Sequence, residues 1–594
     1  MRTVLCCLGF LTFAISMNAQ QPSFSKLAEQ YMYESLAISP VNASYAGYHK
    51  HTDPKTGKVL ELDAMLDDVS PEGWSKQIAF YREWQKRFRQ IKPQSLDLQD
   101  QTDWRLIDDN IAFSLLQMER MQTQKYQPQI YVELIGNALF LPLTQNYAPL
   151  DVRLAHVLAR IEAIPRLVEQ TKQSVTQADP IFISTAKLEN PGNIDLIENT
   201  IKEEIPAGSP LRQRYDVAAP KAIAALKDLD NWLDSDLAKR KTTQTWRTGK
   251  DFYAEKFRLV MQTPVTPEQV LATAEQELKQ VRAEMLSLAL PMHKQMYPDH
   301  SDHADLAEHE RENKIISEVL MRISDEHPNR DRLLPTIEAD INGITQFIRD
   351  KKIVALSDRQ NLKVMPTPPF MRGIFSVAGF HGAPPLEPNA EAQYWVTPIS
   401  SDTPEDQAES RLREYNNWTL KWLTIHEALP GHYIQFEHAN NLQPENRRLL
   451  RNLFGNGAYI EGWAEYIAQV MMDEGFLDNS PKFRMVMRKL RLRLLANTIL
   501  DVRMQTMNMS DDEAMKLMTE ECFQTEAEAK GKLRRAKLSS TQLPTYYVGL
   551  KDWLQLRHDY QAKMGSKFNM IEFHNAVLDQ GPVPIMYLRQ VIMK

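Results

Sequence analysis

The chain has few cysteines and, beyond its first residues, no long apolar run. Only three cysteines occur in 594 residues, and Cys6 and Cys7 both lie in the leader described below. Once that leader is removed Cys522 stands alone, so no internal disulfide can form, and we expect an inert thiol there rather than a catalytic one. No later segment reaches the roughly eighteen apolar residues of a membrane span, so we expect none.

Glycine and net charge are also low. The chain has 21 glycines, fewer than the usual ~7%, and its abundance of Leu, Gln, Glu, Arg and Met favours helix over sheet. A net charge of −7 argues against nucleic acid as the main partner, which would require a basic face. Because 594 residues exceed what one hydrophobic core usually supports, we predict a mostly α, multi-helix protein with two lobes.

Residues 1–19 have the features of a signal peptide. Arg2 supplies the positive start, residues 4–17 the apolar stretch, and Ala19 the small residue at the end. We predict cleavage near Ala19 and export, to the periplasm or out of the cell. A lipid anchor on Cys6 or Cys7 is disfavoured because too little apolar sequence precedes them.

A change in composition divides the rest of the chain. Residues 364–398 are rich in proline and glycine, and within them residues 374–377 and 393–397 read as short strands. We therefore predict an N-terminal helical lobe over 20–363 and a C-terminal lobe over 364–594. The small sheet would form a wall against which an extended substrate could pair.

The most informative stretch is His-Glu-Ala-Leu-Pro-Gly-His at residues 426–432. Two histidines this close suggest zinc, but in the usual zinc helix they are four residues apart and share a face. Here they are six apart, so the backbone must deviate between them, which Pro430 and Gly431 permit. Two interpretations remain open. Either a local loop-out brings the rings onto one ion, or the helix ends at Pro430 and Gly431, a new one starts at His432, and both histidines merely pack.

The preceding segment predicts a long amphipathic helix. Thr403 has the character of an N-cap, with Pro404 at the first helical position. His426 then lies on the apolar stripe, and an inward histidine needs a hydrogen bond or a metal. Apolar residues on this stripe are Tyr415, Trp418, Trp422 and Leu429.

A catalytic zinc site has a third protein ligand and one position left open for water. Glu461, on an apolar predicted helix around residues 458–466, is the best candidate, and Glu465 is an alternative ligand or a group that orients a histidine ring. Glu427, directly after the first histidine, is the candidate general base. The polar run at residues 299–303, with His309 beyond it, is interpreted as a hydrophilic loop rather than a ligand cluster.

At these residues the chain resembles the bacterial family known as domain of unknown function 885, marked by H-E-x-x-P-G-H followed by E-G-W-A. The motifs fall at residues 426–432 and 461–464, and the resemblance extends to Asp501, Tyr546 and His574. It departs at Gln505, where the family usually has histidine, and at residues 540–542, where Ser-Thr-Gln replaces Pro-Gly-Gln.

The family in turn resembles the glutamate-zincin metallopeptidases, which are mostly helical with the site in a channel between lobes. The resemblance implies one Zn²⁺ held by His426, His432 and Glu461, with Glu427 as base. Tyr546 would stabilise the oxyanion. Glu465, Asp501 and His574 would orient neighbouring groups or bind substrate.

We therefore predict an exported zinc hydrolase that cleaves short peptides. A zinc hydrolase of a non-peptide amide or ester, and a non-catalytic helical binding protein, remain as alternatives. The sequence leaves the oligomeric state open.

Overall fold

The fold is described from a computed structural model, in which residues 23–300, 303–368, 372 and 377–594 are placed. Over this part of the chain the structure is mostly helical, as predicted, with one two-stranded and one three-stranded sheet. No helix within it is both long and apolar enough to cross a membrane. The predicted signal peptide and most of the predicted strand at 374–377 lie outside the described residues.

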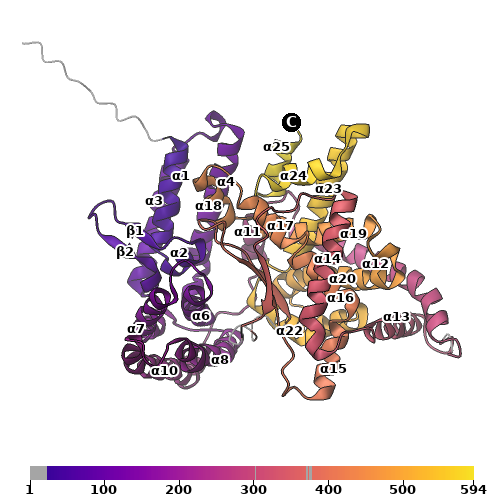
Figure 1. The fold of residues 1–594 in the computed structure, drawn as a ribbon, viewed down its shortest axis with the longest axis horizontal. Coiled ribbons are helices and arrows are strands. Elements are labelled where there is room, and N and C mark those ends of the chain that lie inside the picture. Colours follow the sequence, from indigo (N-terminus) through magenta and orange to yellow (C-terminus); the bar gives the residue numbers. More distant parts are fainter. Residues whose placement is uncertain (1–22, 301–302, 369–371, 373–376) are drawn as a thin grey trace, which may run out of the picture.

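The N-terminal helices, drawn in indigo and purple, form one half of the molecule (Figure 1). The long helices α7 and α10 pack against each other and, with α6 and α8, enclose a core of their own that includes Leu139, Val157 and Leu226. The elements of this half are α1 (Phe24–Ala37), α2 (Pro40–Ala46), β1 (Lys50–Thr52), β2 (Val59–Glu61), α3 (Pro71–Arg89), α4 (Leu98–Leu115), α5 (Thr123–Tyr126), α6 (Gln129–Thr144), α7 (Leu150–Ser174), α8 (Pro180–Asp195), α9 (Lys202–Glu204) and α10 (Leu211–Ser235).

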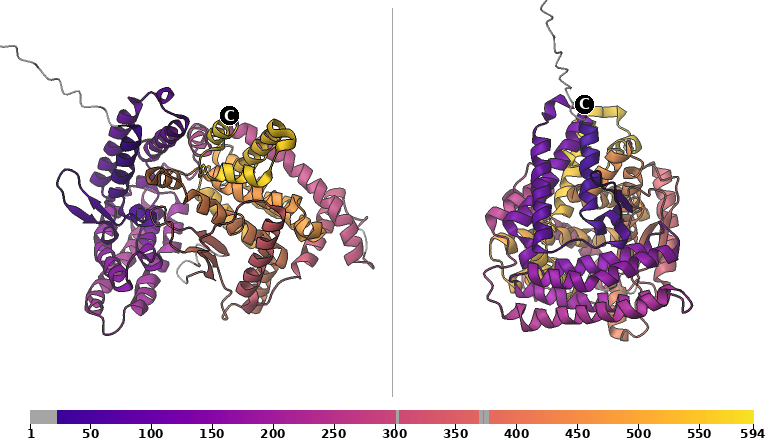
Figure 2. Two further views of the ribbon diagram at one scale, coloured as in Figure 1. Left: turned by 45° about the horizontal axis from the view of Figure 1, so that its top comes forward. Right: turned by 90° about the vertical axis from the view of Figure 1, so that its left-hand side faces the viewer.

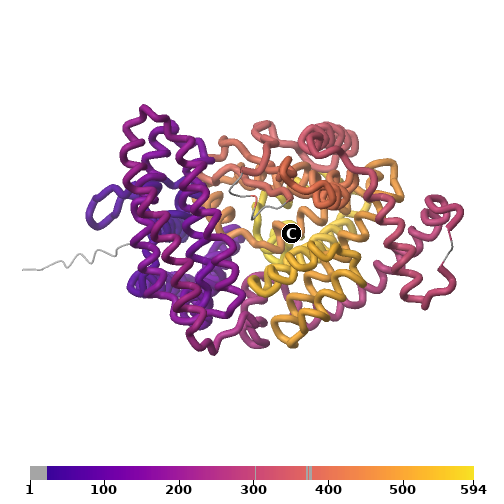
Figure 3. Tube along the Cα trace, turned by 90° about the horizontal axis from the view of Figure 1, so that it is seen from below, coloured from indigo at the N-terminus to yellow at the C-terminus, as the bar shows by residue number. Residues whose placement is uncertain are grey.

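The next four helices pack with the C-terminal part of the chain. They are α11 (Lys250–Met261), α12 (Pro267–Met296), α13 (Glu308–Ser324) and α14 (Leu333–Lys351). Helices α12 and α13 pack side by side and both contact α20. In Figures 1 and 3 their connection lies at the end of the molecule away from the N-terminal helices. The predicted lobe boundary at residue 363 stays a prediction, but these helices share a core with elements beyond it.

A three-stranded sheet lies between the two halves (Figure 2). Its order is β3-β5-β4, with β3 (Leu362–Pro366) parallel and β4 (Ala378–His381) antiparallel to the central β5 (Ala392–Val396). Strand β5 is buried along its whole length. It overlaps the strand predicted at 393–397, shifted by one residue toward the N-terminus.

The C-terminal helices, orange to yellow in Figure 1, carry the candidate site. Helix α19 packs closely against α23, and α20 packs against α12. The helices are α15 (Glu405–Glu414), α16 (Asn417–Glu427), α17 (His432–Ala439), α18 (Glu445–Leu453), α19 (Gly457–Asp473), α20 (Pro481–Thr506), α21 (Asp511–Lys516), α22 (Glu526–Leu538), α23 (Thr545–Met564), α24 (Met570–Leu578) and α25 (Ile585–Ile592).

The single helix predicted from Thr403 onward is wrong, because two helices, α15 and α16, occupy this stretch. The Asn416 carboxamide oxygen accepts hydrogen bonds of 3.1 Å from the backbone N–H groups of Trp418 and Thr419. This N-cap starts a new helix and leaves Tyr415 outside both. Pro404 directly precedes α15, so Thr403 is not its cap.

Candidate metal centre

The turn between α16 and α17 brings the two histidines of the motif together. Helix α16 ends at Glu427, Ala428 has non-helical angles (φ −111°, ψ −89°), and α17 begins at His432. A Cβ on Gly431 would lie 1.9 Å from the His426 carbonyl oxygen, so only glycine fits there. The helix therefore ends at Glu427, three residues before the end that the packing interpretation expected at Pro430, and the next helix begins at His432 as that interpretation expected. The chain nevertheless folds back far enough for the two rings to meet, as the metal interpretation required.

Glu461, on α19, meets both histidines. The Nε2 atoms of His426 and His432 each lie 3.6 Å from the Glu461 Oε2 atom, and all three possible ligand atoms lie within 4.8 Å of one another. Ligands about 2.1 Å from a tetrahedral zinc ion are about 3.4 Å apart. The two imidazoles and the carboxylate therefore fit one zinc ion with little movement.

The charges of the cluster are strongly coupled. Burial alone would raise the pKa of Glu461, but its contacts with His426 and His432 lower that pKa well below its usual range. Burial likewise lowers the pKa of His426, but the neighbouring carboxylates of Glu461, Glu465 and Glu427 together raise it to about 9. Imidazole binds a metal only when deprotonated. Binding of an ion would therefore release a proton from this cluster.

Glu465 lies one turn beyond Glu461 on the same helix, on the far side of His426. Its Oε1 atom is 3.5 Å from the His426 Nδ1 atom, and both side chains are buried. A carboxylate in this place can hold the ring with its Nε2 atom toward Glu461. This position is compatible with the orienting role expected for Glu465, which stays a prediction.

Trp463 supports the turn from behind. Its indole N–H donates a 3.0 Å hydrogen bond to the Pro430 carbonyl oxygen. The edge of the His574 ring packs against it, with centroids 5.4 Å apart. His574 itself is fully buried between the Tyr466 hydroxyl and the Ile353 carbonyl oxygen, each 2.7 Å away. The structure therefore places His574 in support of the site rather than in reach of a substrate.

Two glycines bring α19 and α23 into contact. A Cβ on Gly462 would lie 2.4 Å from the Gly549 carbonyl carbon, so neither position tolerates a side chain without movement. Glu461 directly precedes Gly462, and Tyr546 lies one turn before Gly549. Burial, and then the charge of Glu461, raise the pKa of Tyr546 to about 12, so its hydroxyl keeps its proton.

A cavity of about 870 Å³ adjoins the cluster, and Glu461 forms part of its wall. Its other walls come from both halves of the molecule, including Asn110 on α4, Lys256 on α11 and Ile460 on α19. Lys256 donates a 2.8 Å hydrogen bond to the Ser540 hydroxyl. Glu461 thus belongs both to the cluster and to the cavity.

Asp501 lies behind this wall. It is fully buried, and burial raises its pKa far above the usual range, although the positive charge of Lys256 opposes the shift. Burial lowers the pKa of Lys256 to about 8. Asp501 therefore interacts electrostatically with Lys256, and the orienting role expected for it stays a prediction.

At the positions where the chain departs from the family pattern, the side chains serve the same wall. The Gln505 Oε1 atom accepts a 2.8 Å hydrogen bond from the Thr248 N–H, and its Nε2 atom donates one of 2.8 Å to the Ala536 carbonyl oxygen. Gln542 accepts a 2.7 Å hydrogen bond from Arg535. Arg535 also donates a 3.1 Å bond to the Tyr546 hydroxyl.

Comparisons with known proteins agree with the resemblance seen in the motifs. The family described as bacterial protein of unknown function (DUF885) matches residues 40–592. A solved structure from Shewanella oneidensis is 28% identical, with a TM-score of 0.80, and the match covers 96% of this chain and 100% of that one. A second, from Colwellia psychrerythraea, is 16% identical, with a TM-score of 0.76, and covers 96% and 98%, so it shows a shared fold. Both are described as putative lipoproteins. No curated protein matches the chain.

Proposed function

The chain belongs to the DUF885 family of bacterial proteins, and we propose that it is a zinc-dependent hydrolase of short peptides. The observation that carries the proposal is the meeting of His426, His432 and Glu461 beside a cavity. Two imidazoles and one carboxylate are a ligand set of catalytic zinc sites, which leave one position for water. This arrangement is typical of the glutamate-zincin peptidases.

The remaining residues of the site supply proton transfer and charge stabilisation. A zinc ion in this cluster would lower the pKa of a bound water toward about 7. Glu427, the last residue of α16, would accept the proton of that water and pass it to the leaving amine. The protonated Tyr546 hydroxyl would donate a hydrogen bond to the oxyanion. Glu465 would keep His426 oriented throughout.

The cavity and the sheet favour a small, extended substrate. A volume of about 870 Å³ lies within the roughly 300–1,000 Å³ of small-molecule sites, so the cavity holds a few residues rather than a folded protein. Strand β4 is an edge strand of the described sheet, and the ring of its Phe380 lies 6.5 Å from that of His432. A peptide paired along this edge would run toward the metal cluster.

We propose that the protein works outside the cytoplasm, after cleavage near Ala19. The leader pattern at residues 1–19 supports this location, and so does the description of both structural relatives as putative lipoproteins. The N-terminal residue of the mature protein, determined by mass spectrometry, tests the proposal. A mature chain that begins at Cys6 or Cys7 and carries a lipid would contradict cleavage near Ala19 and would show a lipid-anchored protein.

Zinc content and activity of the untagged mature protein test the function. We expect the wild type to hydrolyse members of a short-peptide library and to lose this activity with a chelator. His432→Ala should remove the zinc of this site and the activity. His438→Ala is the matched control: it lies on the same helix, but its Nδ1 atom pairs with Asp579 at 2.7 Å.

The same assay includes a panel of non-peptide amides and esters. If the protein hydrolyses only compounds of that panel, the proposed metal chemistry stands and the substrate is a non-peptide amide or ester. A wild type that hydrolyses nothing, or whose activity survives both the chelator and His432→Ala, would refute the zinc hydrolase.

A further inference from the structure

A second group of metal-ligating side chains lies at the connection between α12 and α13. We propose that His293, His300, His303 and Glu318 bind one divalent transition-metal ion, zinc above all, as a structural site that closes this connection. One ligand atom from each residue lies within 4.8 Å of the others. This site is separate from the cluster at His426 and has no part in the proposed hydrolysis.

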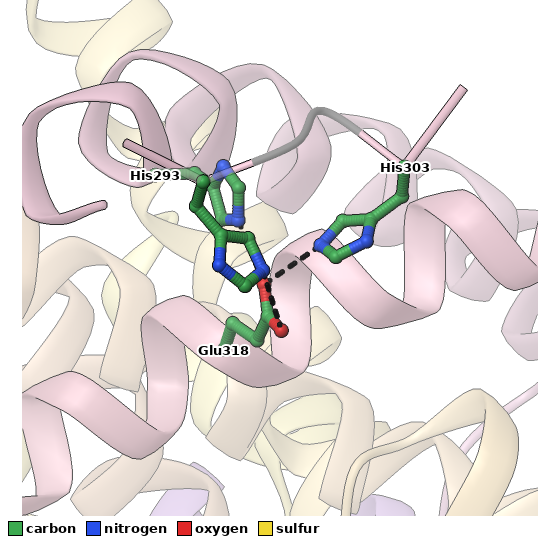
Figure 4. A group of neighbouring side chains, drawn as sticks. His293, His303 and Glu318 are labelled. Atoms are coloured by element: carbon green, nitrogen blue, oxygen red, sulfur yellow. Dashed lines mark hydrogen bonds and ion pairs between the residues drawn. The ribbon is translucent and has the colours of Figure 1, made fainter. Parts of the chain in front are cut away.

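The three imidazoles converge on one carboxylate. The Nε2 atoms of His293 and His303 lie 2.8 and 2.9 Å from the Glu318 Oε2 atom, and the His300 Nε2 atom lies 3.3 Å from Oε1. Figure 4 shows the rings of His293 and His303 directed at the Glu318 carboxylate from two sides. The same ring nitrogen of every histidine therefore points to one place.

The rings also pack against one another. Their centroids are 4.9 Å apart for His300 and His303, 5.6 Å for His293 and His303, and 5.7 Å for His293 and His300. Three protonated imidazoles at these distances would repel one another. A single dication bound to three neutral imidazoles and one carboxylate removes that repulsion and uses every inward nitrogen.

Burial ranks the ligands. The side chains of His293 and Glu318 are 7% and 8% exposed, whereas that of His300 is 41% exposed. His293 lies in the last turn of α12 and Glu318 in the middle of α13, so the two buried ligands are held by helices. His300 and His303 come from the segment between them. We expect His293 and Glu318 to contribute most to affinity and His300 least.

The geometry needs only a small adjustment to hold an ion. The present nitrogen–oxygen separations of 2.8 to 3.3 Å are shorter than the ~3.4 Å between ligands of tetrahedral zinc, so the ring nitrogens must move away from the Glu318 oxygens by up to about 0.6 Å. The Lys314 ammonium lies 3.2 Å from the Glu318 Oε1 atom and would have to leave. Its side chain is 52% exposed and can turn into solvent.

Three imidazoles and one carboxylate are ligands that zinc, nickel and copper share. Four protein ligands leave no position for a substrate, which distinguishes a structural site from a catalytic one. An ion here would tie the segment between α12 and α13 to both helices. We therefore expect it to protect residues 297–307 from proteases.

Zinc stoichiometry in paired variants tests the proposal, using the full mature chain without a polyhistidine tag. After equilibration with zinc and desalting, elemental analysis should find two equivalents in the wild type. His293→Ala and Glu318→Gln should each hold one, and so should His432→Ala. The double variant His293→Ala/His432→Ala should hold none. His309→Ala is the matched control, because this neighbouring histidine pairs with Glu521 at 3.2 Å and should keep two.

A second measurement guards against misfolded variants. Zinc should slow proteolysis within residues 297–307 at least tenfold in the wild type and in His432→Ala, but not in Glu318→Gln. Equal zinc content in the wild type, His293→Ala and Glu318→Gln would overturn the proposal, and so would proteolysis that zinc does not affect. A third outcome is also informative: the wild type holds one equivalent of zinc, Glu318→Gln loses it and His432→Ala keeps it. That result would support this site and refute the proposed catalytic one.

Discussion

The indole nitrogen of Trp463 lies 3.0 Å from the Pro430 carbonyl oxygen, so a residue of α19 holds the turn that joins the two histidines. Glu461, two residues earlier on the same helix, faces those histidines. One helix therefore supplies both a candidate ligand and the support that places the other two. This relationship explains why the E-G-W-A motif accompanies H-E-x-x-P-G-H in this chain.

Trp463→Phe should weaken metal binding without removing a ligand. The change leaves the buried Pro430 carbonyl without its donor, which costs about 1–3 kcal/mol of unfolding free energy. Loss of such a supporting contact lowers zinc affinity by roughly 10–100-fold. Zinc titration against a competing chelator measures the affinity. Trp553→Phe is the control: its indole bonds to the Tyr459 carbonyl oxygen at 3.1 Å, so it should lose stability but keep the affinity.

Gly431→Ala should remove the metal at this site. An added Cβ would lie 1.9 Å from the His426 carbonyl oxygen and 2.4 Å from that of Ile425, so the turn must open and carry His432 away. Elemental analysis and the midpoint of thermal unfolding measure the result. Gly343→Ala, within α14, meets nothing within 4 Å and should stabilise by about 0.5–1 kcal/mol. An alanine at 431 with normal zinc and normal melting would contradict the turn described above.

Glu427→Gln should separate metal binding from catalysis. An amide cannot accept the proton of water, so hydrolysis should fall by roughly 10²–10⁴, while zinc content stays that of the wild type. Rates on the best peptide substrate and elemental analysis give the two readouts. Glu405→Gln, on a side chain that is 90% exposed, should change neither. Wild-type rates in Glu427→Gln would remove this residue from the mechanism.

Tyr546→Phe should lower kcat more than it raises KM. Its hydroxyl would be needed when the oxyanion forms, and loss of one such donor costs roughly 10²–10³ in rate. Steady-state kinetics separate the two constants. Tyr547→Phe is the matched control, because the hydroxyl of this neighbour donates to Glu277 at 2.9 Å. An equal effect of both changes would point to packing of α23 rather than to catalysis.

His574 should make the fold sensitive to mild acid. Burial lowers its pKa to about 3, so the folded chain keeps it neutral. Below about pH 6.5 the unfolded chain binds a proton that the folded chain does not, and stability falls as the pH falls. The loss from this histidine between about pH 6.5 and pH 5 is about 2 kcal/mol. Urea unfolding at the two pH values should show a smaller loss in His574→Gln, and an unchanged loss would contradict the assignment.

Much of the candidate site follows from short-range patterns in the sequence. The adjacent His426 and Glu427 indicate a metal site, and the Pro-Gly step predicts the turn that follows them. An acidic residue on an apolar helix identifies Glu461 as a candidate ligand. Asn416, in contrast, does not stand out as a cap in the sequence, because the apolar stripe continues across it and favours one helix. Local capping decided the outcome over the periodicity of apolar residues.

The second cluster shows what local patterns miss. The run at residues 299–303 looks polar on every side, and nothing in it predicts a buried partner. That partner, Glu318, comes from the next helix, where Ile315, Ile316 and Val319 mark the buried face. A glutamate on an apolar face was the available signal. It becomes informative only when α12 and α13 are known to pack together.

The contact between Gly462 and Gly549 also limits how the molecule can move. Because sliding of α19 along α23 would bring the two backbones into collision, we expect Glu461 and Tyr546 to keep their relative positions. We therefore expect the motion that admits a substrate or releases its products to occur elsewhere, where the N-terminal helices and residues 244–248 border the cavity.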